Sequence, residues 1–309
     1  MTAQTCILIG APVDSGKARR GCVMGPDAYR VAGLQAALTD LGHRVQDTGN
    51  LASDAATAPD TLPGHIHAPA ETIGWTRALM RAGRAAFAEG VPIFLGGDHS
   101  LSLGSLTAAA AAAAAAGRPQ FVLWLDAHSD MHTPQSTGSG NLHGTPLGYA
   151  TGLPGFHGFP PVAHPVRPEN VCLLGLRSVD GPERAALEGS RMRYHDMRAI
   201  DEHGIARPLA AFLADVARAD GALHVSLDVD FLDPSFAPAV GTTVPGGATM
   251  REAHLVMEMV SDSGLLSSLD LVELNPFLDD RGRTAQVMVD LAASALGRRV
   301  FDRPTQAFG

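Results

Sequence analysis

The sequence predicts an α/β fold in which a mostly parallel central sheet lies between two layers of helices. Short apolar runs alternate with longer helix-like segments along the 309 residues. The apolar runs are nearly continuous, as in strands that are buried on both faces. No stretch is long or polar enough to be a linker between domains. We therefore expect a single three-layer domain over residues 1–309.

Each element of this fold follows from a local pattern. Six segments have the length and apolar character of strands: residues 6–10, 91–97, 121–127, 170–176, 222–230 and 268–274. Seven amphipathic or alanine-rich segments are predicted helices: residues 26–41, 70–89, 101–116, 181–188, 205–219, 250–262 and 283–296. The nine consecutive alanines at 108–116 favour a tightly packed helix, because alanine has the highest helix propensity. Residues 52–69 and 151–169 are rich in proline and glycine and are predicted surface loops.

The charge balance and cysteine content of the chain limit the kinds of molecule that it is expected to bind. The chain has 23 basic and 32 acidic residues, a net charge of −9, and no basic block. We therefore expect no nucleic-acid partner, whereas cationic small molecules suit such a chain. Its three scattered cysteines form no disulfide framework or zinc knuckle, which suits a reducing cytoplasm. The N-terminus shows no signal-peptide pattern, and no apolar run could span a membrane, so we expect a cytoplasmic protein without a membrane partner.

Side chains that can bind metal ions follow three of the predicted strands. They are His99 after the second strand, Asp126, His128, Asp130 and His132 at or after the end of the third, and Asp228 and Asp230 at the end of the fifth. Alternate side chains of an extended chain share a face, so residues spaced by two converge on one side. Open α/β sheets place their sites at the carboxyl ends of strands. We therefore expect these groups to meet at one edge of the sheet.

Such a cluster requires cations. Four carboxylates this close repel one another by several kcal/mol unless they are protonated or neutralised. Two divalent metal ions, bridged by at least one aspartate from each pair, would neutralise them. Oxygen ligands with a minority of imidazole favour manganese, cobalt or iron, and zinc is less natural. Each motif alone is a common turn or surface pattern, so the prediction depends on their joint occurrence.

Three motifs resemble the metal signatures of the arginase-type ureohydrolases: GGDHS, DAHSD and SLDVDFLDPSFAP. The resemblance extends over nearly the whole chain, through IGAPVDSGKARRGCVMGPDAYRVAGL, GLRSVDGPE and LDLVELNPFLD. The segment STGSGNLHGTPLG is similar to the loop of arginases more than to that of agmatinases. The resemblance implies an arginase-like fold and two Mn²⁺ ions, with Co²⁺ or Fe²⁺ as possible substitutes. It also implies a homo-oligomer, either a trimer or a hexamer.

The resemblance further implies a mechanism. One metal ion would be held by His99, Asp126, Asp130 and Asp228, and the other by Asp126, His128, Asp228 and Asp230, so that Asp126 and Asp228 bridge. A hydroxide shared by the ions would attack the guanidinium carbon of L-arginine, giving L-ornithine and urea. Asp130 would orient this hydroxide, and His143 would carry a proton to the leaving amine. Glu273 would bind the guanidinium group through charge-assisted hydrogen bonds.

Loop residues would bind the amino-acid head of the substrate. Ser139 and Asn141 correspond to family positions that contact the α-carboxylate, and Asp180 corresponds to one that binds the α-amino group. Glu183 would assist through water-mediated contacts, and Thr242 lies at a family position near the guanidinium group. Polar residues of these types also populate loops for turn formation alone.

Two positions depart from the family pattern. His132 stands where arginases usually have asparagine, and Ser178 stands where many have aspartate. Because six ligands are complete without His132, we expect this histidine to contact substrate rather than metal. The substitution leaves hydroxyarginine, guanidinobutyrate or another guanidino compound as alternative substrates. Agmatine fits less well, because Asp180 and the 139–143 loop suit an amino-acid head.

Two alternatives assign the chain a different activity. It could be a catalytically silent relative that binds a guanidino ligand, although the predicted metal and proton-transfer residues are all present. It could instead share only its fold with arginases, as metal-dependent deacetylases do. The paired aspartate motifs argue against that second possibility.

Overall fold

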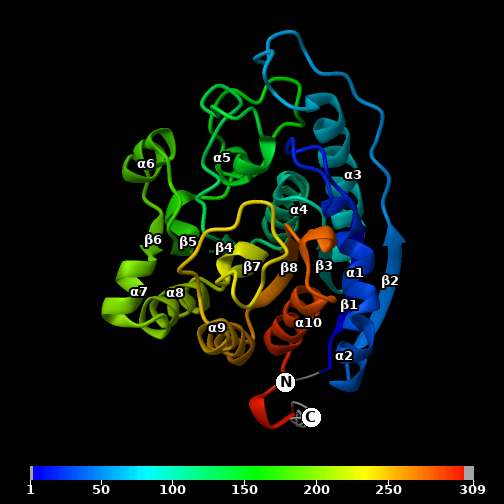
Figure 1. Cartoon of the computed structure of the whole chain (residues 1–309), viewed down its shortest axis with the longest axis vertical. Coiled ribbons are helices and arrows are strands. Elements are labelled where there is room, and N and C mark those ends of the chain that lie inside the picture. The colour runs from blue at the N-terminus through cyan, green and yellow to red at the C-terminus, as the bar shows by residue number, and fades with distance from the viewer. Residues whose placement is uncertain (1–2, 303–309) are drawn as a thin grey trace.

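An eight-stranded sheet, parallel throughout, forms the centre of this computed structural model, which describes residues 3–302 (Figure 1). The strands are β1 (Thr5–Ala11), β2 (Arg44–Asn50), β3 (Val91–Gly96), β4 (Gln120–Leu125), β5 (Val171–Leu176), β6 (Arg193–Asp196), β7 (Ala222–Asp228) and β8 (Leu266–Val272). Their order across the sheet is β2-β1-β3-β8-β7-β4-β5-β6. The two ends of the predicted domain, residues 1–2 and 303–309, lie outside the described residues.

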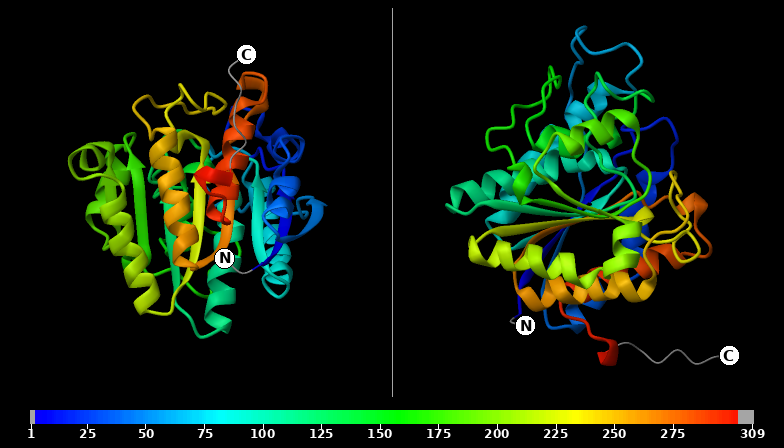
Figure 2. Two further views of the ribbon diagram at one scale, coloured as in Figure 1. Left: turned by 90° about the horizontal axis from the view of Figure 1, so that it is seen from below. Right: turned by 90° about the vertical axis from the view of Figure 1, so that its left-hand side faces the viewer.

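Helices cover both faces of the sheet, which confirms the predicted three-layer α/β fold (Figure 2). One layer contains α3 (Pro69–Phe87), α4 (Ser102–Ala115), α5 (Pro146–Ala150) and α6 (Gly181–Glu188). The other contains α1 (Gly25–Val31), α2 (Leu34–Asp40), α7 (Met197–His203), α8 (Ala206–Arg218), α9 (Met250–Ser263) and α10 (Arg283–Ala295). Successive strand residues face opposite layers, so Ile7 and Ile9 pack with α3 whereas Cys6 and Leu8 pack with the second layer.

The six predicted strands are all present, and two further strands form the edges of the sheet. These edge strands, β2 and β6, have the sequences RVQDTGN and RYHD, and their side chains are exposed or only partly buried. An edge strand has one neighbour and buries little apolar surface, so no apolar run marks it in the sequence.

The predicted helix over residues 26–41 is in fact two helices. Gly33, between α1 and α2, has φ of +89°, in the left-handed region that glycine adopts without a steric penalty. Helices α5 and α7 were not predicted, because segments of five and seven residues hold too few turns to show a helical period. Within residues 3–302, no helix combines the length and apolar character that crossing a membrane requires.

The two predicted loops have no helix or strand over residues 52–68 and 151–167, but they are not merely surface segments. Leu62 and Ile66 of the first loop join Phe159 of the second in one buried cluster, which also contains Leu142. His67 N donates a hydrogen bond to Gly140 O at 2.9 Å. The loops therefore brace the segment 137–143, in which several predicted substrate contacts lie.

The alanine-rich helix α4 packs closely on α3, as predicted. A Cβ atom added at Gly104 of α4 would lie 2.9 Å from the carbonyl oxygen of Thr76 and closer still to Cβ of Leu79. Both neighbours belong to the interior of α3, where neither can move without shifting the helix. Glycine at this position is therefore required by the approach of the two helices.

We predict that Gly104→Ala lowers the free energy of unfolding. Crowding costs about 1–3 kcal/mol, which exceeds the gain in helix propensity of up to ~1 kcal/mol. Urea denaturation measures the change. Gly64→Ala is the matched control, because nothing lies within 4 Å of its added Cβ and its backbone is unstrained. A Gly104→Ala protein as stable as its parent would contradict this account of the helix contact.

Candidate metal centre and active site

The predicted metal-binding residues meet at the carboxyl ends of β3, β4 and β7. His99 opens a short 3₁₀ turn three residues after the end of β3, Asp126 follows β4 directly, and Asp228 is the last residue of β7. In the sheet these strands lie close together, separated only by β8 between β3 and β7. Their shared parallel direction brings the three side chains to one edge, as the sequence predicts.

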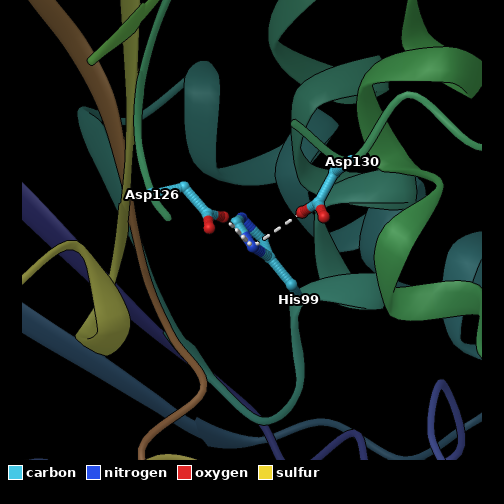
Figure 3. Close-up of side chains that lie close together, drawn as sticks. All are labelled: His99, Asp126 and Asp130. Carbon is cyan, nitrogen blue, oxygen red and sulfur yellow. Dashed lines mark ion pairs between the residues drawn. The ribbon is translucent and has the colours of Figure 1, made fainter. Parts of the chain in front are cut away.

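His99 lies at the centre of the first group of ligands (Figure 3). Its Nδ1 atom is 3.1 Å from Asp126 Oδ2, 3.1 Å from Asp130 Oδ2 and 3.2 Å from Asp228 Oδ2. Its Nε2 atom lies 2.8 Å from Ser226 Oγ, and its ring stacks on Trp124 with centroids 4.3 Å apart. These contacts fix the imidazole with Nδ1 directed at the carboxylates.

His128 completes a second group beside the first. Its Nδ1 atom is 3.1 Å from Asp230 Oδ2 and 3.4 Å from Asp126 Oδ1. Asp126 therefore offers one oxygen to each histidine and belongs to both groups. Two adjacent groups that share a carboxylate could hold two metal ions bridged by that carboxylate.

The electrostatics of the cluster fit divalent cations. Burial and the charge of Asp126 raise the pKa of Asp130 to about 6, and burial with neighbouring carboxylates raises the pKa of Asp228 and of Asp230. Asp126 Oδ2 and Asp130 Oδ2 are buried yet accept no hydrogen bond. Buried carboxylate oxygens without donors, facing imidazole nitrogens, are a donor set typical of a metal centre.

The pKa values of the two histidines in the cluster are raised as well, which favours their charged form. Although burial acts to lower it, the charge of Asp230 and contacts with Asp126 raise the pKa of His128 to about 12. His99 is also buried, but its three aspartate contacts raise its pKa well above the usual value. Both shifts favour the protonated, cationic imidazole when no metal ion is bound.

Two site residues have a strained backbone. Asp130 has φ of +51° and Glu273 has φ of +67°, a region that costs a residue with a side chain about 1 kcal/mol or more. Such strain persists only where the surrounding structure imposes it. At both positions it turns the chain sharply next to the cluster.

A cavity of about 150 Å³ opens above the cluster. Five of the six predicted metal ligands line it, all except Asp230. It is also lined by the predicted residues His132, Ser139, Asn141, His143, Glu183 and Thr242. Thr137 and Gly144 line it too and were not predicted, although both lie within or beside the loop that resembles the family.

Two residues predicted to bind substrate do not line the cavity, namely Asp180 and Glu273. Asp180 Oδ2 lies 3.1 Å from Nε2 of His132, so it adjoins the cavity through that histidine. Asp180 also accepts a hydrogen bond from Glu183 N at 3.0 Å and caps α6. Asp180 therefore caps α6, a role that aspartate often has at the start of a helix, whether or not it also binds substrate.

Glu273 lies beneath the cavity, with an exposed fraction of 1%. Its Oε1 atom accepts a hydrogen bond from His99 N at 2.8 Å and lies 3.0 Å from Nδ1 of His143. Its Oε2 atom forms an ion pair with Lys17. Although burial opposes it, the charges of Lys17 and His143 hold the pKa of Glu273 well below its usual value.

Sequence reasoning did not identify Lys17. It lies in the glycine-rich segment between β1 and α1, 256 residues before its partner. No local pattern connects the two residues. The remaining departure, Ser178, lies beyond β5, where its backbone N–H donates to Ala127 O at 3.0 Å, next to the first cluster of ligands.

Comparison with known proteins identifies the family. A sequence model of the Arginase family matches residues 4–297. The chain is 60% identical over 305 residues to an arginase of Brucella melitensis, covering 98% of this chain and 99% of that protein. It is 56% identical to an arginase of Agrobacterium fabrum, with 99% and 94% covered. The crystal structure of an arginase from Bacillus subtilis superimposes with a TM-score of 0.84 at 36% identity, covering 96% of this chain and 99% of that one.

We predict that metal binding releases protons and weakens as the pH falls. The raised pKa values of His99 and His128 favour protonated imidazoles, with which a metal ion must compete, and acidification strengthens this competition. The raised pKa values of Asp130 and Asp228 act in the same direction.

Calorimetric titration of the metal-free protein with Mn²⁺ measures this, in two buffers of different ionisation enthalpy. Between about pH 6 and 8, apparent affinity is expected to rise by about tenfold per pH unit for each proton released. Affinity that does not change with pH, with no proton release, would contradict the raised pKa values of the two histidines.

Proposed function

Because this chain belongs to the arginase family, we propose that it hydrolyses L-arginine to L-ornithine and urea. The family makes it a hydrolase that acts on the C–N bond of a guanidino group. The observation that carries the choice of chemistry is the pair of ligand groups sharing Asp126 at the floor of a cavity.

The proposed cofactor is a pair of Mn²⁺ ions, with Co²⁺ or Fe²⁺ as possible substitutes. One would be held by His99, Asp126, Asp130 and Asp228, and the other by Asp126, His128, Asp228 and Asp230. When bound, the ions would supply a water molecule of lowered pKa as the nucleophile. Hard oxygen donors with two imidazoles suit these metals better than thiolate-preferring ones.

Three side chains would act on the reacting groups. Asp130, which lines the cavity, would accept a hydrogen bond from the attacking water and orient it. His143 would carry a proton to the leaving amine. Its Nδ1 lies 3.0 Å from Glu273, whose charge raises the pKa of His143 against the effect of burial. Glu273 would receive the guanidinium group through charge-assisted hydrogen bonds.

The amino-acid head of the substrate would lie at the cavity wall. Ser139 and Asn141 would bind the α-carboxylate, and His132 would add a further donor. Asp180 would bind the α-amino group, assisted by Glu183. The contact between His132 and Asp180 links the two halves of this head-binding region. Thr242, which donates a hydrogen bond to Asp230 Oδ2 at 3.1 Å, lies beside the position proposed for the guanidinium group.

A panel of substrates tests this assignment. On the Mn²⁺-loaded protein we expect the highest kcat/KM for arginine or hydroxyarginine, at least about tenfold above agmatine and guanidinobutyrate, a gap of about 1.4 kcal/mol in transition-state binding. Urea release is measured for each compound. A preference for agmatine would contradict the roles of Asp180 and the 139–143 loop, and no urea from any compound would favour a silent guanidino-binding relative.

Asp180→Asn tests the α-amino contact separately. Asparagine is as good a helix cap as aspartate, so α6 should be retained while the charge is lost. We expect kcat/KM for arginine to fall about tenfold or more, because a hydrogen bond to a charged group contributes about 1.5–3 kcal/mol. Guanidinobutyrate, which lacks the α-amino group, is the matched control and should be unaffected. Equal losses for both substrates would assign Asp180 to helix capping alone.

We further propose that the chain works in the cytoplasm as a homo-oligomer, either a trimer or a hexamer. The oligomeric state rests on the family alone, whereas the cytoplasm rests on the three scattered cysteines, which suit a reducing compartment. Light scattering would then give three or six times the chain mass of 32.1 kDa. A mass of one chain would contradict it.

A further inference from the structure

Lys17 is a buried cation that the proposed mechanism does not use. Its side chain is 3% exposed and forms an ion pair with Glu273. Its Nζ atom also lies 3.0 Å from Sγ of Cys22. Lys17 does not line the cavity and is not a metal ligand. It neutralises the carboxylate that the proposed function gives to the substrate.

The hydrogen-bonding capacity of Glu273 is largely used. Oε1 accepts from the backbone of His99 and lies within hydrogen-bond distance of His143, while Oε2 is held by Lys17. A substrate guanidinium group that binds here would place a second cation on one buried carboxylate. Two like charges a few ångströms apart in such an environment repel strongly. Simultaneous binding of Lys17 and the substrate guanidinium group to Glu273 is therefore unfavourable in free energy.

Other acids are ready to stabilise Lys17 if it leaves Glu273. Asp98 and Asp14 are buried, and both interact electrostatically with the lysine. Asp98 Oδ2 accepts a hydrogen bond from Gly16 N at 2.8 Å, and Asp14 Oδ2 accepts one from Gly21 N at 2.9 Å. The segment that carries Lys17 is thus folded around two carboxylates. The flexible four-carbon side chain of lysine can turn from Glu273 towards Asp98 or Asp14.

We propose that Lys17 is an internal competitor of the substrate: it neutralises Glu273 in the empty site and yields this carboxylate to the incoming guanidinium group. The inference rests on the proposed role of Glu273. Lys17 prevents an uncompensated buried charge when no substrate is present. A guanidinium group can displace it because its planar, forked donors can take the positions on Oε2 that the single ammonium group vacates. Lys17 therefore sets the affinity for guanidino compounds and disfavours ligands that carry only an amine.

Lys17→Met tests the proposal, because the competition predicts a change in KM and little change in kcat. Methionine fills a similar volume without charge, so the competitor is removed. We expect KM for arginine to fall about tenfold, with kcat within about twofold of the parent. The inhibition constant of the guanidinium ion, used as a simple probe at millimolar concentration, should fall in parallel. Cys22→Ala is the matched control, since it removes the other neighbour of Lys17 and the weak thiol contacts with Glu273 but no charge, and should leave both constants unchanged.

A change in kcat without a change in KM would overturn the proposal. If kcat falls and KM does not, Lys17 remains on Glu273 during turnover and positions His143 instead. Lys17→Gln provides a second variant should the methionine variant fail to fold, because glutamine can still donate a hydrogen bond to Glu273; the same fall in KM is expected.

Binding of the guanidinium ion separates this proposal from the proposed function. Calorimetry on the metal-loaded protein needs no turnover, and we expect tighter binding by Lys17→Met than by the parent. If the parent releases no urea while the variant binds guanidinium more tightly, the proposed function fails and the competition stands. If the parent is active and the variants bind guanidinium no more tightly, only the competition fails.

Discussion

Mutual repulsion among buried carboxylates is the constraint on which the rest of this structure depends. Asp126, Asp130, Asp228 and Asp230 are each at most 4% exposed, and they come from the ends of two neighbouring strands. The parallel sheet places these strand ends side by side, so the carboxylates lie together whether or not a cation is bound. The raised pKa values of His99 and His128 favour a compensating positive charge on the imidazoles. The fold itself therefore creates the affinity for divalent metal ions.

The interior beneath the cluster is polar as well, which is unusual for the centre of a sheet buried on both faces. On the face covered by α4, Asp270 of β8 accepts hydrogen bonds from Ser102 Oγ at 2.7 Å and Ser105 Oγ at 2.5 Å. His224 Nδ1 lies 2.8 Å from Ser268 Oγ on the neighbouring strand. These hydrogen bonds join α4 to β8 and β8 to β7. They help to fix the arrangement of the elements that carry the ligands.

The centre of this fold could be read from the sequence, whereas its edges and one charged contact could not. Continuous apolar runs mark the central strands because both of their faces are buried, and the spacing of Asp126, His128 and Asp130 marks the site because alternate residues converge. Strands β2 and β6 bury too little to leave such a pattern. The pairing of Lys17 with Glu273 depends on strand order, which brings β1 and β8 to either side of β3. Only the folded chain places these two residues together.

The most direct test of this account is a crystal structure of the Mn²⁺-loaded protein, with the metal located by its anomalous scattering. If two cations neutralise the carboxylates, the map contains two anomalous peaks. Each marks an ion bound to Asp126, one beside His99 and the other beside His128. Asp126 and Asp228 well separated, with no ion between them, would contradict it. A single ion held by one group alone would do the same.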